Sequence, residues 1–153
     1  MRLALVLHVN GRDPASLQLA LATMTALNEL YLSQNQGVPR LYRSGVVYAT
    51  EPNEHASVAS SEERIASIPE VLRLGWGDCD DLACYLSAER RVFDGIRCEP
   101  RVVLEAVRPD GSHFWHVVVA HPDGSMEDPS LALGMNPDGE SLAGIYPEES
   151  ELR

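Results

Sequence analysis

The chain has 153 residues, of which 44% are hydrophobic and 23% are charged, and its formal net charge is −11. This length and composition are typical of one globular domain with a sizeable core. The negative charge argues against nucleic acid as a partner, because phosphates would be repelled, and against anionic membrane surfaces. No apolar run is long enough to span a bilayer, and three cysteines without a C-x-x-C motif favour a reducing cytoplasm over a disulfide framework.

The N-terminal segment predicts a strand followed by a long helix. Residues 3–9 are apolar and predict the strand. Asp13 and Pro14 are typical of an N-cap and a first helical residue, and the helix is expected to run to about Gln36. Its inner stripe recurs at helical spacing and is assigned to the core: Leu17, Ala20, Leu21, Met24, Leu27 and Tyr31.

The next segment is expected to be mostly irregular. Residues 46–49 predict a short strand, and the polar residues 51–63 predict a connecting loop with one helical turn. Residues 67–74 resemble a short helix that ends at Gly75.

A second helix is predicted to begin at a cysteine. Asp78 is a good N-cap, Asp81 matches the acidic member of a capping box, and the helix should continue to about Arg91. Cys79 would then lie among unpaired backbone N–H groups at the positive end of the helix dipole, which lowers a thiol pKa. The neighbouring carboxylates oppose this effect, so a thiolate would need a histidinium partner. The alternative is an inert, buried cysteine on the apolar helix face.

Three strands are predicted after this helix. They cover residues 102–107, residues 113–121 and a short piece that begins at Ser125. Turn signals at residues 109–111 and 122–124 separate them, so we expect an antiparallel meander.

A thiol, an imidazole and a carboxylate occur in an order that favours nucleophilic catalysis. Cys79 would be the nucleophile, His116 the base that takes its proton, and Asp128 the group that orients the imidazole. His116 and Asp128 share a sheet face only if paired residue numbers sum to an even number, as with a three- or five-residue loop. His113 and His121 compete for the base role, but both are expected to be surface histidines because they border turns.

The motif Gly77-Asp78-Cys79-Asp80-Asp81-Leu82-Ala83, with His116-Val117 in a strand and Glu127-Asp128-Pro129-Ser130 after it, resembles the transglutaminase-like superfamily, which has a papain-like fold. It is similar in particular to small members from phages and prophages. The resemblance covers roughly residues 45–135 and preserves the superfamily's order of Cys, His and Asp.

The resemblance implies an α+β fold with a papain/transglutaminase-like core, in which the cysteine helix packs on the antiparallel meander. We expect one such domain over residues 1–135 and an acidic, solvated tail over residues 136–153. Cys79, His116 and Asp128 would be catalytic. The Cys79 backbone N–H and a second donor would form an oxyanion hole. Trp76 is the candidate for that donor or for shaping the pocket, its alternative being a core anchor.

The leading functional prediction is cysteine-dependent acyl transfer or amide hydrolysis on a protein or peptide substrate, as in a thiol protease, amidase or transglutaminase-like enzyme. Water and an amine both remain open as acceptors, and no cofactor is expected. Asp80 is a candidate for holding a cationic substrate group, its alternative being a solvated surface carboxylate.

Two other functions remain open. One is a non-catalytic, phage-type assembly or interaction protein that keeps the fold and binds phage structural proteins or another basic partner. The other is a metal site made by Cys79, His116 and Asp128, with His113 as an optional fourth ligand, although the paired short intervals of structural zinc are missing. A calcium loop at Asp78 and Asp80 is less favoured, since the rest of an EF-hand is absent.

Overall fold

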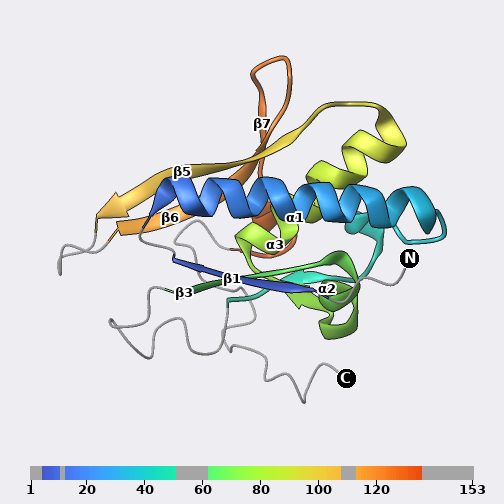
Figure 1. The fold of residues 1–153 in the computed structure, drawn as a ribbon, viewed down its shortest axis with the longest axis horizontal. Helices are drawn as coiled ribbons and strands as arrows, with labels where there is room; N and C mark the ends of the chain where they lie inside the picture. Colours follow the sequence, from blue (N-terminus) through green and yellow to red (C-terminus); the bar gives the residue numbers. More distant parts are fainter. Residues whose placement is uncertain (1–4, 11–12, 51–61, 108–112, 136–153) are drawn as a thin grey trace.

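The computed structural model describes residues 5–10, 13–50, 62–107 and 113–135. Helices pack against small β-sheets in this part of the chain, so the expected α+β class is confirmed. The long helix α1 (Pro14–Gln34) crosses the molecule, with β5 (Glu99–Val107) on one side of it and β1 (Val6–Asn10) on the other (Figure 1).

The start of α1 follows the predicted capping pattern. Asp13 is the N-cap, and its Oδ1 accepts a hydrogen bond of 3.1 Å from the backbone N–H of Ala15. Pro14 occupies the first turn, where a missing N–H removes no helical hydrogen bond. The helix ends two residues earlier than predicted. Most of the inner stripe is buried, namely Leu17, Ala20, Leu21 and Met24, while Leu27 and Tyr31 are half-buried.

The short helix α2 (Ile68–Leu74) brings the chain to the start of the central helix. It ends at Gly75, whose φ of 78° lies in the left-handed region that favours glycine. The next two residues form β4 (Trp76–Gly77), which pairs in parallel with β2 (Val47–Tyr48). The turn at Gly75 therefore sets the direction in which the chain enters the cysteine helix.

The cysteine helix α3 (Cys79–Glu89) is the central helix of the fold. Every residue from 80 to 89 is buried, and α1, β5 and β6 (His113–Ala120) all pack against it. A helix buried on all sides must satisfy its polar side chains inside the protein. The helix continues past the predicted end through the π-helical segment η2 (Arg90–Asp94), which stops at Gly95 with a φ of 67°.

The predicted antiparallel meander is confirmed. The strands β5, β6 and β7 (Met126–Glu127) lie in that order in one sheet. In the second hairpin Val119 pairs with Glu127 and Ala120 with Met126, so the paired numbers sum to an even number. Since α3 packs on this sheet, the expected arrangement of cysteine helix on antiparallel strands is present.

One strand departs from the sequence prediction. Residues 62 and 63 were expected to belong to a loop, but they begin β3 (Glu62–Ala66), which pairs antiparallel with β1. Ile65 and Ala66 are buried, and this pairing with a strand more than 50 residues away gives an otherwise polar segment its conformation. The helical turn expected within residues 51–61 lies outside the described residues, as do the turn at residues 109–111 and the tail at residues 136–153.

Within the described ranges, no helix combines the length and the apolar character that crossing a membrane requires.

The turn at Gly75 generates a test of the path into α3. Gly75→Ala should lower the free energy of unfolding by about 1–2 kcal/mol, because alanine is strained in the left-handed region. Gly37→Ala is the matched control: a Cβ meets no atom within 4 Å at either glycine, but only Gly75 has a positive φ. Urea denaturation should show the loss for Gly75→Ala and almost none for Gly37→Ala, and equal losses would contradict the prediction.

Candidate active site

The thiol of Cys79 is held at the first position of α3 by the predicted capping box. The Asp78 side chain accepts a hydrogen bond of 3.4 Å from the backbone N–H of Asp81, and the Asp81 Oδ2 accepts one of 3.2 Å from that of Asp78. The Asp81 Oδ1 also accepts from the backbone N–H of Ala66 in β3 at 2.7 Å. These hydrogen bonds stabilise the first turn of the cysteine helix and also join it to the neighbouring strand β3.

Position 77 requires glycine because the first turn of α3 lies too close to its backbone to leave room for a side chain. A Cβ at this position would lie 3.0 Å from the Asp81 Cβ and 3.2 Å from the Leu82 Cδ2, both closer than ordinary contacts. A side chain here would therefore push the first turn of α3 away from β4. Close packing therefore explains why glycine precedes Asp78 and Cys79 in this motif.

Cys79 is the most accessible of the three cysteines, all of which are free thiols. It is half-buried against the hydrophobic core, whereas Cys84 and Cys98 are fully buried. Burial raises the pKa of the Cys84 thiol to about 12, and it also raises the pKa of Cys98. Reactivity requires both access and a thiolate, so Cys79 is the candidate nucleophile.

The carboxylates beside Cys79 are buried, so the interpretation of Asp80 as a solvated residue is wrong. Asp80 is 3% exposed and Asp81 is 2% exposed. Burial raises the pKa of both groups, and the charge of Asp81 raises that of Asp80 further. Carboxyl groups that hold their protons to higher pH carry less negative charge, which weakens the opposition to a Cys79 thiolate.

His116 and Asp128 are brought together by the second hairpin of the meander. The His116 Nε2 lies 2.7 Å from the Asp128 Oδ2, and the His116 residue is 2% exposed. The predicted condition on the register is met, because the loop between the paired residues 120 and 126 has an odd number of residues. Two members of the predicted triad therefore form a close pair.

Asp128 divides its two oxygens between a helix and the histidine. It is the N-cap of α4 (Pro129–Ala132), where its Oδ1 accepts from the backbone N–H groups of Ser130 at 3.0 Å and Leu131 at 3.3 Å. Burial alone would raise the pKa of Asp128, but the hydrogen bond and charge of His116, together with these N–H groups, hold it below its ordinary value.

The ionised state of Asp128 assigns the proton on the imidazole. A carboxylate can only accept, so the His116 Nε2–H donates to it, and in the neutral imidazole Nδ1 then carries the lone pair that a general base needs. The element that carries this base, β6, packs against α3, which begins at Cys79. Contact between the Cys79 thiol and the His116 Nδ1 stays a prediction.

Trp76 is buried, as the alternative role of core anchor requires. It packs with Ala49 and Leu74 in a small cluster apart from the main core and is 2% exposed. Its indole Nε1 is buried and has no hydrogen-bond partner in the described part of the chain. Buried indole N–H groups usually find an acceptor, so a buried donor without one in this part of the chain is unusual. The oxyanion role stays a prediction.

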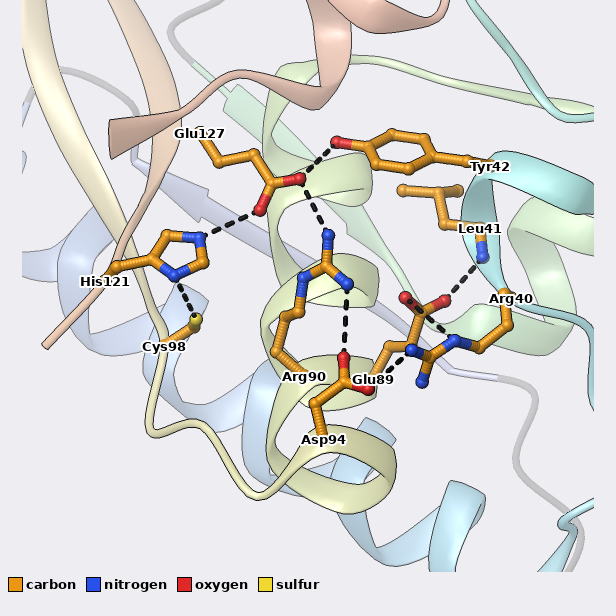
Figure 2. A network of polar contacts seen from close by, with 9 residues as sticks. All are labelled: Arg40, Leu41, Tyr42, Glu89, Arg90, Asp94, Cys98, His121 and Glu127. Atoms are coloured by element: carbon orange, nitrogen blue, oxygen red, sulfur yellow. Dashed lines mark hydrogen bonds and ion pairs between the residues drawn. The ribbon is translucent and has the colours of Figure 1, made fainter. Parts of the chain in front are cut away.

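His121 belongs to a polar network rather than to the surface, so the sequence prediction for it was wrong (Figure 2). Its Nε2 lies 2.8 Å from the Glu127 Oε1, and its Nδ1 lies 3.5 Å from the Cys98 Sγ. The same even-sum rule that joins residues 116 and 128 also joins residues 121 and 127. That rule could have identified the second pair, but nothing in the sequence indicated Cys98.

The one compact group of possible metal ligands among the described residues consists of Glu63, Asp78 and Asp80, whose ligand atoms lie within 4.8 Å of one another. The metal site predicted as an alternative at Cys79, His116 and Asp128 is not such a group. The side chain of His113, its fourth candidate ligand, lies outside the described part of the structure.

No protein-family model, no curated protein and no solved structure matches this chain.

The depressed pKa of Asp128 generates a pH prediction. A carboxyl group whose folded pKa lies below its ordinary value of 3.8 stabilises the folded state above that pH, and the stabilisation is lost as the pH falls through the folded pKa. Asp128→Asn keeps an N-cap for α4 but removes the charge. The stability difference between wild type and Asp128→Asn should therefore be larger at about pH 5 than at about pH 3. Urea denaturation at the two pH values checks this, and equal differences would contradict it.

Proposed function

We propose that this chain is a cysteine-dependent acyl-transfer enzyme with a papain/transglutaminase-like core, acting as a thiol peptidase or amidase or as a transglutaminase. Cys79 is the nucleophile, His116 the general acid and base, and Asp128 the orienting group. The observation that supports this most strongly is the 2.7 Å pair of His116 and Asp128 on a strand that packs against the helix beginning at Cys79.

In the proposed reaction His116 takes the proton of the Cys79 thiol on Nδ1, because Nε2 is committed to Asp128. The thiolate attacks the carbonyl carbon of an amide, and the negative charge moves to the carbonyl oxygen. His116 then gives its proton to the departing amine, which leaves an acyl group on Cys79 as a thioester. Water or a second amine attacks the thioester, again with His116 as the base, and the thiol is regenerated.

Two donors are available for the oxyanion of this intermediate. The first backbone N–H groups of a helix have no partner within the helix, and Cys79 occupies the first position of α3. The indole N–H of Trp76, which has no partner among the residues that the structure describes, is the proposed second donor. Trp76 and Cys79 are three residues apart and are joined through Gly77 and the capping box, so a fixed segment carries both groups.

An acceptor amine would have to come from another molecule. All twelve basic residues of the chain are arginines, so the chain has no lysine and offers no ε-amine of its own. The predicted role of Asp80 in holding a cationic substrate group extends to the cluster of Glu63, Asp78 and Asp80, where a bound cation would favour the ionised form of Asp80 that burial disfavours. Glu63 is half-buried while both aspartates are buried, so a substrate would reach Glu63 first.

The test of this proposal is the alkylation rate of each cysteine. Wild type is treated with iodoacetamide from pH 5 to pH 9, and the peptides that contain Cys79, Cys84 and Cys98 are quantified separately by mass spectrometry. Cys79 should react at neutral pH about tenfold faster than free cysteine, because an imidazole partner raises its thiolate fraction. The two buried cysteines are internal controls and should stay almost unmodified in the folded protein.

His116→Ala separates activation from simple exposure. If the imidazole activates Cys79, this variant should lower the alkylation rate of Cys79 at neutral pH to that of free cysteine. A Cys79 that is no faster than free cysteine in wild type, and is indifferent to His116→Ala, would remove the nucleophile from the proposal. That result would favour the non-catalytic assembly or interaction protein instead.

A further inference from the structure

Glu127 is the centre of a polar network that joins three distant segments of the chain (Figure 2). Its Oε2 accepts hydrogen bonds from the hydroxyl of Tyr42 at 2.8 Å and from the Nη2 of Arg90 at 2.9 Å. Its Oε1 lies 2.8 Å from the Nε2 of His121. The donors come from the 3₁₀ helix η1 (Leu41–Arg43), from η2 and from the residue that follows β6. The side chain of Glu127 is thus held from three directions.

The charge state of Glu127 determines which groups donate hydrogen bonds in this network. Burial would raise the pKa of Glu127, but the hydrogen bonds from Arg90, His121 and Tyr42 hold it below its ordinary value, so the group is a carboxylate at neutral pH. The His121 Nε2–H therefore donates to it, and the other ring nitrogen, Nδ1, lies 3.5 Å from the buried thiol of Cys98.

The partners of Glu127 are themselves fixed. Arg90 also binds the Oδ2 of Asp94 at 3.1 Å, and the other oxygen of Asp94 accepts from Arg40 at 2.6 Å. Arg40 lies over the ring of Phe93, with its guanidinium carbon 5.3 Å from the ring centroid. A network of connected hydrogen bonds and ion pairs restrains its side chains more than an isolated surface ion pair does.

The strand that carries Glu127 makes few contacts of its own, and the chain after it is held by α4, which packs against α3 and β6. β7 has two residues and pairs with β6 only at Val119 and Ala120, and Met126, its other member, is 51% exposed. A strand this short adds little stability of its own. The ion pairs of Glu127 are therefore the main side-chain attachment of β7 to the body of the protein.

Asp128 follows Glu127 directly, and its Oδ2 meets His116. Successive residues of a strand point to opposite faces, so the hairpin carries one imidazole–carboxylate pair on each face. His116 with Asp128 forms one pair, at 2.7 Å, and His121 with Glu127 forms the other, at 2.8 Å. A shift of β7 along β6 would break both pairs together.

We propose that Glu127 is a positioning residue for the Cys79–His116–Asp128 site: its contacts with Tyr42, Arg90 and His121 fix the segment that delivers the Asp128 carboxylate to His116. This inference rests on the proposed function and extends it to a residue that does not touch the reacting atoms.

Glu127→Gln tests the inference, because it keeps the size of the side chain and removes the charge. Asp94→Asn is the matched control: it also removes a carboxylate that binds Arg90, but it lies on η2 and not on the strand that leads to Asp128. Both variants should lose stability. Only Glu127→Gln should lower the alkylation rate of Cys79 at neutral pH, by about tenfold, and its pH profile should shift in the same direction as that of Asp128→Asn measured beside it.

A second readout does not depend on the reactivity of Cys79. The carboxyl carbon of Asp128, followed by NMR during acid titration, should have a midpoint below 3.8 in wild type and in Asp94→Asn. In Glu127→Gln the midpoint should move up towards 3.8, since Asp128 is no longer held against His116.

The two proposals fail in different ways. If wild-type Cys79 is no more reactive than free cysteine, the proposed function fails, and the Asp128 midpoint still decides the positioning role. If Glu127→Gln leaves both the Asp128 midpoint and the Cys79 pH profile as in Asp94→Asn, Glu127 contributes only to stability and the inference is overturned.

Discussion

The two oxygens of Asp128 make the contacts on which the arrangement of the site depends. One oxygen accepts the first N–H groups of α4, and the other accepts the Nε2–H of His116. The helix cap fixes the carboxylate in space, and the fixed carboxylate selects the tautomer and orientation of the imidazole. Aspartate caps helices well, and here the same carboxylate also orients the imidazole. The cost of burying its charge is offset by three hydrogen-bonding partners.

The cysteine end of the site depends on a second carboxylate with a divided role. Asp81 closes the capping box of α3 through one oxygen and binds the backbone of β3 through the other. Cys79 is held between these contacts and the close approach of Gly77. The surrounding acidic residues are buried, which raises the pKa of Asp80 and Asp81 and leaves the positive end of the helix less opposed at the thiol.

The features that the sequence predicted well are those set by neighbouring residues. The N-cap at Asp13, the stop at Gly75 and the capping box of Asp78 with Asp81 each depend on contacts within four residues. The pairing of His116 with Asp128 is more distant, but a single hairpin register decides it, and that register has only two classes.

The features that the sequence did not predict depend on contacts between distant segments. The strand β3 forms because β1 is available to pair with it, and Asp80 is buried because α3 is surrounded on all sides. His121 is half-buried because Cys98, from a segment 23 residues earlier, contacts it in addition to Glu127 of its own hairpin. Local propensity and periodicity carry no information about such neighbours, so a histidine beside a turn was assigned to the surface.

The most direct test of the catalytic assignment is the distance between the Cys79 Sγ and the His116 Nδ1 in a crystal of the protein. We predict a separation within about 4 Å, with the His116 Nε2 still bonded to Asp128. An imidazole whose Nδ1 faces away from the sulfur, with no rotamer of Cys79 that closes the gap, would contradict it.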